Sequence, residues 1–190
     1  DEDGRAPRAD REARDPRLSR FEAVATARAS TSSEPPREPL AALEAARTVP
    51  LPYQTGALFH GPRFQLLESL ETGRAGARGV IRVPAELASL QQELVLDAAT
   101  HVIPHDGLHA WSEALPADRA AYPYRIERAW LGSFPTSGTL EVEARLERVD
   151  EHAHLRLVLS HGGRVCADLS LVELLLPKGP IGLAAPADRA

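Results

Sequence analysis

The strongest constraint on the fold is a strict alternation of apolar and charged residues in Gly138–Val149. Leu140, Val142, Ala144 and Leu146 are each separated from the next by a single charged residue. Because successive side chains of a strand point to opposite faces, this period of two predicts a strand with one buried face and one solvated face. Strands of this kind are typical of antiparallel sheets.

Similar patterns on both sides of this segment predict further strands. A turn is expected at Gly162–Gly163, because both glycines accept the positive φ of a tight hairpin. The other expected strands are Leu66–Thr72, Gly79–Val83, Tyr124–Phe134, Leu155–Ser160 and Arg164–Leu176. The segment between Tyr124 and the preceding helix is predicted to be mostly loop, with Trp111 as its anchor in the core. The order is therefore two strands, one helix and about four more strands.

The helix around which these strands wrap is predicted at Leu90–Ile103. Leu90, Leu94 and Ala98 recur at helical spacing and form an apolar stripe, and Pro104 ends the helix. An antiparallel sheet curled round a single central helix satisfies this order of elements. We therefore expect the α+β class and the hotdog fold, with a generic α+β sandwich as the alternative.

Composition narrows the classes of function. The formal net charge of −5 favours neither nucleic acid nor an anionic membrane surface as a partner. No segment reaches the roughly 18 apolar residues of a membrane-spanning helix. The single cysteine, Cys166, cannot form an internal disulfide and is expected to be a small buried thiol in a cytoplasmic protein.

The 190 residues are enough for one domain, which we expect at residues 51–180. Residues 1–50 are predicted to be a linker, largely disordered, with short helices such as one at Leu40–Val49. Residues 181–190 are expected to be a linker tail. The chain begins with Asp1 and contains no methionine, so we expect it to be a segment of a longer protein.

Asp97 is the one charged residue between Leu94 and Ile103, in a run that otherwise favours burial. Asp97 and His101 are four residues apart, so their side chains can meet one turn along a helix. A buried carboxylate is costly unless it is hydrogen-bonded or protonated, and a protonated carboxyl can serve as a proton donor. The alternative is a solvated polar stripe with an ordinary Asp–His pair.

Other kinds of catalytic site receive little support. His101, His105 and His109 recur at intervals of four, as metal ligands on a continuous helix would, but Pro104 and Gly107 interrupt that helix. No metal site is therefore predicted. The sequence contains no cysteine cluster, no Gly-rich phosphate loop and no Gly-x-Ser-x-Gly motif.

Two short segments carry a family resemblance. Leu58–Gln65 has the sequence Leu-Phe-His-Gly-Pro-Arg-Phe-Gln, and Leu96–His101 has the sequence Leu-Asp-Ala-Ala-Thr-His. They resemble the Gly-Pro-x-Phe-Gln and Asp-x-x-x-Gln/His motifs of dehydratase domains in polyketide synthases and polyunsaturated fatty acid synthases. The resemblance covers roughly residues 51–180.

This resemblance implies a double hotdog of which the chain is the second, C-terminal half. In such domains a histidine of the first half removes the α-proton of a 3-hydroxyacyl thioester, and an aspartate of the second half protonates the departing β-hydroxyl. Asp97 matches that acid, and His101 matches the residue that holds it. None of the seven histidines lies in the His-x-x-x-Gly-x-x-x-x-Pro motif of the base.

The resemblance also implies the substrate and the partners. The substrate would be carried on the phosphopantetheine of an acyl carrier protein, with no bound cofactor, and the product would be a 2-enoyl thioester. The partners would be that carrier protein and the N-terminal hotdog half of the same parent chain, with a homodimer as a further option. The expected substrate-binding residues are His60, Gly61, Pro62, Phe64, Leu94 and Ala98. His60 stands where many members of the family have tyrosine.

Two alternatives from other functional classes stay open. One is a non-catalytic, dehydratase-like scaffold module in a megasynthase. The other is a single-hotdog thioesterase or hydratase that acts as a dimer. The sequence of the parent chain upstream of this segment distinguishes them, since a His-x-x-x-Gly-x-x-x-x-Pro motif there favours catalysis.

Overall fold

The computed structural model describes residues 40–178, apart from residue 59 and residues 86–89. Every described residue belongs to one unit of the chain, Glu34–Ala190. Both predicted linker ends lie largely outside the described residues.

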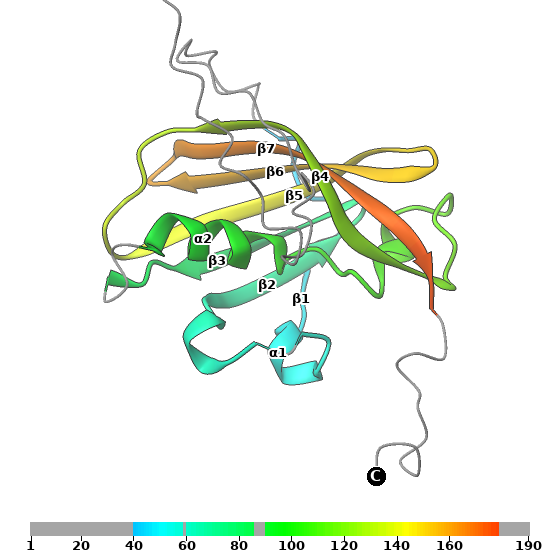
Figure 1. Ribbon diagram of the computed structural model, residues 1–190, viewed down its shortest axis with the longest axis horizontal. Coiled ribbons are helices and arrows are strands. Elements are labelled where there is room, and N and C mark those ends of the chain that lie inside the picture. Colours follow the sequence, from blue (N-terminus) through cyan, green and yellow to red (C-terminus); the bar gives the residue numbers. More distant parts are fainter. Residues whose placement is uncertain (1–39, 59, 86–89, 179–190) are drawn as a thin grey trace, which may run out of the picture. The chain divides into compact units, whose positions relative to one another are not determined.

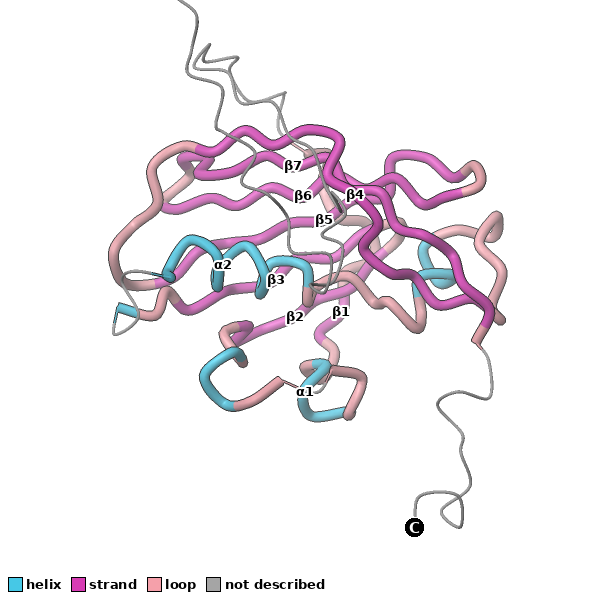
Figure 2. Tube along the Cα trace, viewed as in Figure 1, coloured by secondary structure: helices cyan, strands magenta, loops and turns pink. Residues whose placement is uncertain are grey.

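The described residues form one antiparallel sheet with short helices (Figure 2). The strands are β1 (Arg47–Thr48), β2 (Leu67–Gly73), β3 (Gly76–Arg82), β4 (Arg119–Leu131), β5 (Thr139–Val149), β6 (His152–His161) and β7 (Arg164–Pro177). The α-helices are α1 (Pro52–Thr55) and α2 (Gln91–Thr100), and the 3₁₀-helices include η1 (Pro62–Phe64) and η3 (Leu108–Trp111).

The strands follow the order β1-β2-β3-β5-β6-β7-β4, and every neighbouring pair is antiparallel. Figure 1 shows α2 lying across one face of this curved sheet, where it contacts β3 and β6. The prediction of an antiparallel sheet around one central helix, the hotdog fold, is therefore confirmed.

The alternation of β5 produces the expected core. Leu140, Val142 and Ala144 are fully buried, as are Leu155 and Leu157 on the neighbouring strand β6. The residues of α2 that face this core are Leu94, Val95, Ala98 and Ala99. Burial of apolar surface at about 25 cal/mol per Å² is the main term that holds the helix on the sheet.

The helix α2 is shorter than predicted at both ends. Leu90 lies at its N-cap and is exposed rather than part of the apolar stripe. At the other end, His101 and Ile103 donate their N–H groups only three residues back, to Ala98 and Thr100. Pro104 explains this tightening, because it disfavours α conformation in the preceding residue and supplies no N–H of its own.

The predicted helix at Leu40–Val49 is wrong for the described residues 40–49, which contain the short strand β1 instead. Arg47 and Thr48 pair with Thr72 and Glu71 of β2. Helical propensity is a weak preference, and the backbone hydrogen bonds of a strand pair override it here.

Three smaller predictions are confirmed. Gly162 and Gly163 form the β6–β7 turn with φ values of +56° and +76°. Trp111 is buried in η3 and donates from Nε1 to Thr72 Oγ1 at 3.3 Å. Cys166 is a buried free thiol, and burial raises its pKa.

None of the helices in the described part of the chain has the length and apolarity needed to span a bilayer.

Candidate functional site

A cavity of about 620 Å³ opens beside the C-terminal end of α2. Its wall includes His60, Asp97, His101, His105 and Trp111. This volume lies within the roughly 300–1,000 Å³ that small-molecule sites occupy. The cavity thus brings four ionisable side chains from separate parts of the sequence to one space.

Asp97 and His101 meet on α2 as their spacing predicts. His101 Nε2 lies 3.5 Å from Asp97 Oδ2. The His101 side chain is buried, but the Asp97 side chain is 49% exposed, so the expectation of a buried carboxylate is wrong. The helix turns Leu94 and Ala98 into the core, which leaves Asp97 at the border between that buried face and the solvent.

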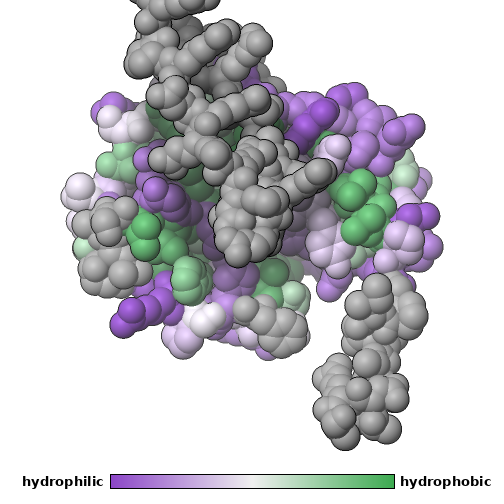
Figure 3. All heavy atoms as spheres, in the orientation of Figure 1, coloured by the Kyte–Doolittle hydropathy of each residue, from purple (hydrophilic) through white to green (hydrophobic). Residues whose placement is uncertain are grey.

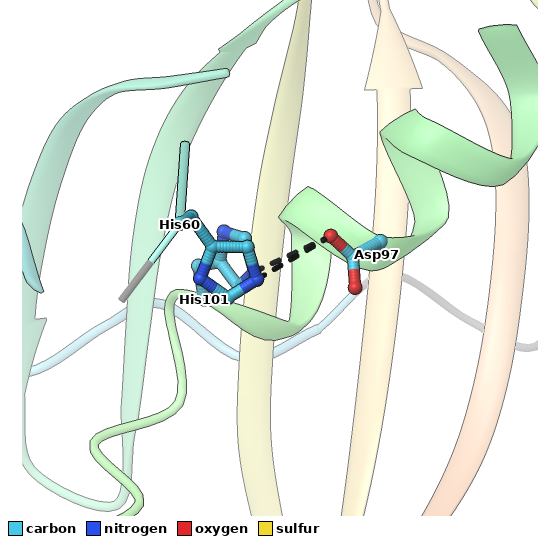
Figure 4. Close-up of side chains that lie close together, drawn as sticks. All are labelled: His60, Asp97 and His101. Atoms are coloured by element: carbon cyan, nitrogen blue, oxygen red, sulfur yellow. Dashed lines mark ion pairs between the residues drawn. The ribbon is translucent and has the colours of Figure 1, made fainter. Parts of the chain in front are cut away.

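His60 completes a cluster around the same carboxylate (Figure 4). Its Nε2 lies 3.9 Å from Asp97 Oδ2, and its ring centroid is 4.4 Å from that of His101. Gln65 Nε2 donates to the backbone oxygen of His60 at 2.7 Å and so closes the turn that carries it. The two sequence motifs, far apart along the chain, therefore meet in space.

Tyr53 holds His101 from the other side, and sequence reasoning missed it. Tyr53 Oη lies 2.6 Å from His101 Nδ1. Burial raises the pKa of Tyr53 despite backbone hydrogen bonds from Leu67 and Leu66, so its hydroxyl stays protonated at neutral pH. A lone tyrosine in an irregular segment gives no periodic signal that would identify this contact.

The protonation state of His101 follows from this environment. Burial, and then the nearby charges of His60 and His105, lower the pKa of His101 from 6.5 to about 4. The imidazole is therefore neutral at neutral pH. Because the Asp97 carboxylate lies beside Nε2, the favoured tautomer has its ring proton on Nε2 and accepts at Nδ1 from the Tyr53 hydroxyl.

A second histidine–carboxylate pair joins His105, which lines the cavity, to Glu173 of β7, which is not among the lining residues. Glu173 of β7 is fully buried, and neither of its carboxylate oxygens has a hydrogen-bond partner among the described residues. His105 Nδ1 lies 3.7 Å from Glu173 Oε2 and 3.1 Å from the backbone oxygen of Ala121. Because a carbonyl oxygen only accepts, Nδ1 carries the proton and Nε2 is left as the basic nitrogen.

Sequence reasoning treated His105 as a loop histidine and did not single out Glu173. The available signal was the same as for Asp97, since Glu173 is the one charged residue between Leu169 and Leu176. Both His105 and His109 follow the end of α2, so they do not line up with His101 on one helix, as predicted.

The other predicted substrate-binding residues are placed away from this cavity. Of that set, His60 lines the wall, whereas Leu94 and Ala98 belong to the core. Gly61, Pro62 and Phe64 are exposed around η1. Substrate binding by these five residues stays a prediction.

Comparison with solved structures shows the same fold in several dehydratase domains. The dehydratase domain of PpsC from Mycobacterium tuberculosis in complex with C12:1-CoA has a TM-score of 0.54 at 22% identity, covering 73% of this chain and 56% of that one. The dehydratase domain of the CurJ module of Curacin polyketide synthase has a TM-score of 0.55 at 12% identity, covering 70% and 51%. The chain thus spans about half the length of these domains.

A solved thioesterase structure is similar as well. Thioesterase HI1161 from Haemophilus influenzae has a TM-score of 0.51 at 13% identity, covering 70% of this chain and 94% of that one. Among curated proteins, no sequence matches.

The family itself is shown at the level of sequence. A family model described as polyketide synthase dehydratase N-terminal domain matches residues 26–174. That description names the N-terminal domain, whereas the two motifs indicate the second half, so the assignment to one half stays a prediction. The match extends over most of the described sheet and includes both motif segments of the cavity. The chain belongs to the polyketide synthase dehydratase domain family.

Proposed function

We propose that this chain is the acid-bearing half of a 3-hydroxyacyl-[acyl-carrier-protein] dehydratase in a polyketide or fatty acid megasynthase. The observation that carries the proposal is the convergence of both motif segments on one carboxylate, since His60 and His101 both lie within 4 Å of Asp97. This cluster lines the cavity of about 620 Å³, a volume in the range of small-molecule sites.

The chemistry needs one base and one acid. A base removes the α-proton of the 3-hydroxyacyl thioester, the bond between the β-carbon and oxygen breaks, and an acid protonates the leaving hydroxyl to give water. Asp97 would supply that proton. His101, held by Tyr53, would orient the carboxyl group through its Nε2 proton.

The upstream hotdog half would supply the base and would also cover Asp97. Half of the Asp97 side chain is exposed in this chain, so another surface can dock against it. Removal of a carboxyl group from water favours its neutral, proton-donating form. The acyl carrier protein would deliver the thioester to the same cavity. A cytoplasmic location belongs to this proposal and fits the single buried thiol.

The proposal is tested by Asp97→Asn in the domain completed with its upstream half. Asparagine keeps the shape of aspartate but has no proton to give, so conversion of a 3-hydroxyacyl carrier-protein substrate should fall about 10²–10⁴-fold. Glu93→Gln is the matched control, because it neutralises an exposed carboxylate one turn earlier on α2 and should leave the rate unchanged. A rate for Asp97→Asn within about threefold of the unmutated domain would contradict the proposal.

A second candidate is a single-hotdog thioesterase or hydratase that acts as a dimer and needs no upstream half. The observation that favours it is the pair of His105 and Glu173, because this chain would then contain its own base. A carboxylate behind Nδ1 stabilises the imidazolium that forms when Nε2 accepts a proton. This candidate predicts that the chain alone turns over acyl thioesters and that His105→Gln abolishes the activity.

The third reading, a non-catalytic scaffold, predicts no turnover by the completed domain. The same assay therefore separates all three readings.

A further inference from the structure

We propose that His60, Asp97 and His101 form a binding site for a divalent transition-metal ion of the zinc class. The ligand atoms of these three residues all lie within 4.8 Å of one another. The inference goes beyond the proposed dehydration and differs from the sequence-based expectation, which considered His101, His105 and His109 and predicted no metal.

The distances between the candidate ligand atoms are close to those between two ligands of a tetrahedral zinc ion. Zinc lies about 2.0–2.2 Å from nitrogen and oxygen ligands, so two ligands of a tetrahedral site are about 3.3 Å apart. The two histidine Nε2 atoms lie 3.5 and 3.9 Å from Asp97 Oδ2. Figure 4 shows both imidazole rings directed at the same carboxylate.

The three side chains differ in burial and in hydrogen-bond partners. His101 is buried on α2 and fixed by Tyr53, so it serves as the rigid member. Asp97 is half exposed, and the buried Nδ1 of His60 has no hydrogen-bond partner among the described residues. The Asp97 and His60 side chains can therefore approach a bound ion without displacement of the core.

Tyr53 is placed to support the metal-bound form of His101. A metal ion on Nε2 requires the tautomer with its proton on Nδ1, and the hydrogen bond to Tyr53 then reverses, so that Nδ1 donates and the Tyr53 oxygen, 2.6 Å away, accepts. Metal-binding histidines almost always donate their second ring N–H to a partner of this kind, and loss of the partner lowers metal affinity about 10–100-fold.

The ligand types favour zinc-class ions over harder cations. Imidazole suits zinc, copper, nickel and iron, whereas magnesium and calcium prefer oxygen ligands throughout. Three protein ligands leave a fourth position for water, and here that position would face the cavity. A bound ion would also occupy the Asp97 carboxylate and prevent it from donating a proton.

The binding test uses the full chain after treatment with a chelator and titration calorimetry with zinc chloride. We expect one zinc ion per chain and a loss of affinity of at least about tenfold in His60→Gln, Asp97→Asn and His101→Gln. The matched control is His152→Gln, because His152 Nδ1 also lies near a carboxylate, 4.0 Å from Asp150 Oδ1, on a distant hairpin. The zinc affinity of His152→Gln should equal that of the unmutated chain.

Asp97→Asn keeps the test decisive if His101→Gln does not fold, since Asp97 is half exposed. Absence of zinc binding, or equal binding by Asp97→Asn and His152→Gln, would overturn the proposal. A tetrahedral cobalt(II) absorption spectrum that disappears in Asp97→Asn would support it independently.

Binding is measured without substrate, so its outcome is separate from that of the dehydratase assay. In an active completed domain, zinc should inhibit dehydration and the chelator should restore it. A domain that dehydrates but binds no zinc contradicts the metal site alone, and a chain that binds zinc but never dehydrates contradicts the proposed function alone.

Discussion

At the scale of single residues, the site depends on how His101 is enclosed. Its ring is packed against Tyr53 and His60, with edge-to-face and tilted geometries at 5.5 and 4.4 Å between centroids. Burial there disfavours the charged imidazolium. His101 is thus neutral beside Asp97 at neutral pH rather than its ionic partner.

This enclosure predicts a pH dependence of stability. The pKa of His101 is about 4 in the folded chain and about 6.5 when unfolded, so the unfolded state binds a proton first as the pH falls. The stability contributed by neutral His101 is complete above about pH 6.5 and is lost progressively towards about pH 4. Thermal unfolding followed by circular dichroism, in buffers with a chelator, should show this decline.

The control for this decline is His101→Gln, which cannot titrate in that range. Its thermal midpoint should fall less between neutral pH and about pH 4 than that of the unmutated chain. If the thermal midpoints of the two proteins fell in parallel as the pH was lowered, His101 would not be the source of the pH dependence.

The hydroxyl of Tyr53 predicts a second effect on stability. Tyr53→Phe removes the partner of His101 Nδ1 and leaves a buried polar atom unsatisfied, which costs about 1–3 kcal/mol. Denaturant unfolding measures this loss. Tyr124→Phe, on the exposed surface of β4, should change the free energy of unfolding by less than about 0.5 kcal/mol. Equal effects of the two substitutions would mean that the contact does not stabilise the fold.

Part of the site could be predicted from the sequence because its spacing is local. Asp97 and His101 are one turn apart on a helix, and His60 lies in a recognisable motif. Tyr53 is separated from His101 by 48 positions, and such a contact depends on the tertiary fold. The burial of Asp97 was predicted wrongly. Helical spacing shows on which face of the helix a residue lies, but not how far round the helix the buried surface extends.

At the scale of elements, the strands were predictable where one face is buried and one is wet, as in β5. The strand β4 is less regular: its register shifts at Pro123, which is tolerated because β4 is an edge strand. In β6 and β7 both faces are buried, so alternation is replaced by apolar runs interrupted by single charges.

One such pair of charges joins β6 to β7 on the face away from α2. Arg156 donates from Nε and Nη2 to the two oxygens of Asp168 at 3.1 and 2.9 Å, and both side chains are buried. Asp168→Ala should destabilise the chain by about 3–5 kcal/mol, because it leaves the buried guanidinium without this carboxylate. Denaturant unfolding measures the effect.

The matched comparison is the double substitution Arg156→Leu with Asp168→Leu. Replacement of both charges by apolar groups should recover most of the loss, since no charge remains buried. A single substitution that costs no more than the double one would contradict this explanation.

At the scale of the whole molecule, the sheet has exposed edges and apolar surface. The 13-residue strand β4 forms one end of the sheet, and its Tyr122, Tyr124 and Ile126 are more than half exposed. Figure 3 shows hydrophobic patches among hydrophilic ones on the face that it draws. Unpaired edges and apolar patches favour association with another chain.

We therefore predict that the isolated 190-residue chain associates with itself. Sedimentation velocity should show concentration-dependent dimers or larger species, and Ile126→Lys should weaken them, because a charge on an edge strand opposes edge-to-edge pairing. A monomer at every concentration would contradict this prediction.

The most direct test of the proposed half-site compares dehydration by this chain alone with dehydration by the chain joined to the upstream half of its parent protein. The proposed acid, Asp97, lies on α2 and the base is expected in the other half, and both must reach the substrate together. We predict no conversion of a 3-hydroxyacyl carrier-protein thioester by the chain alone, and conversion by the joined domain that Asp97→Asn removes. Equal conversion by the chain alone would contradict the half-site and point to His105 as the base.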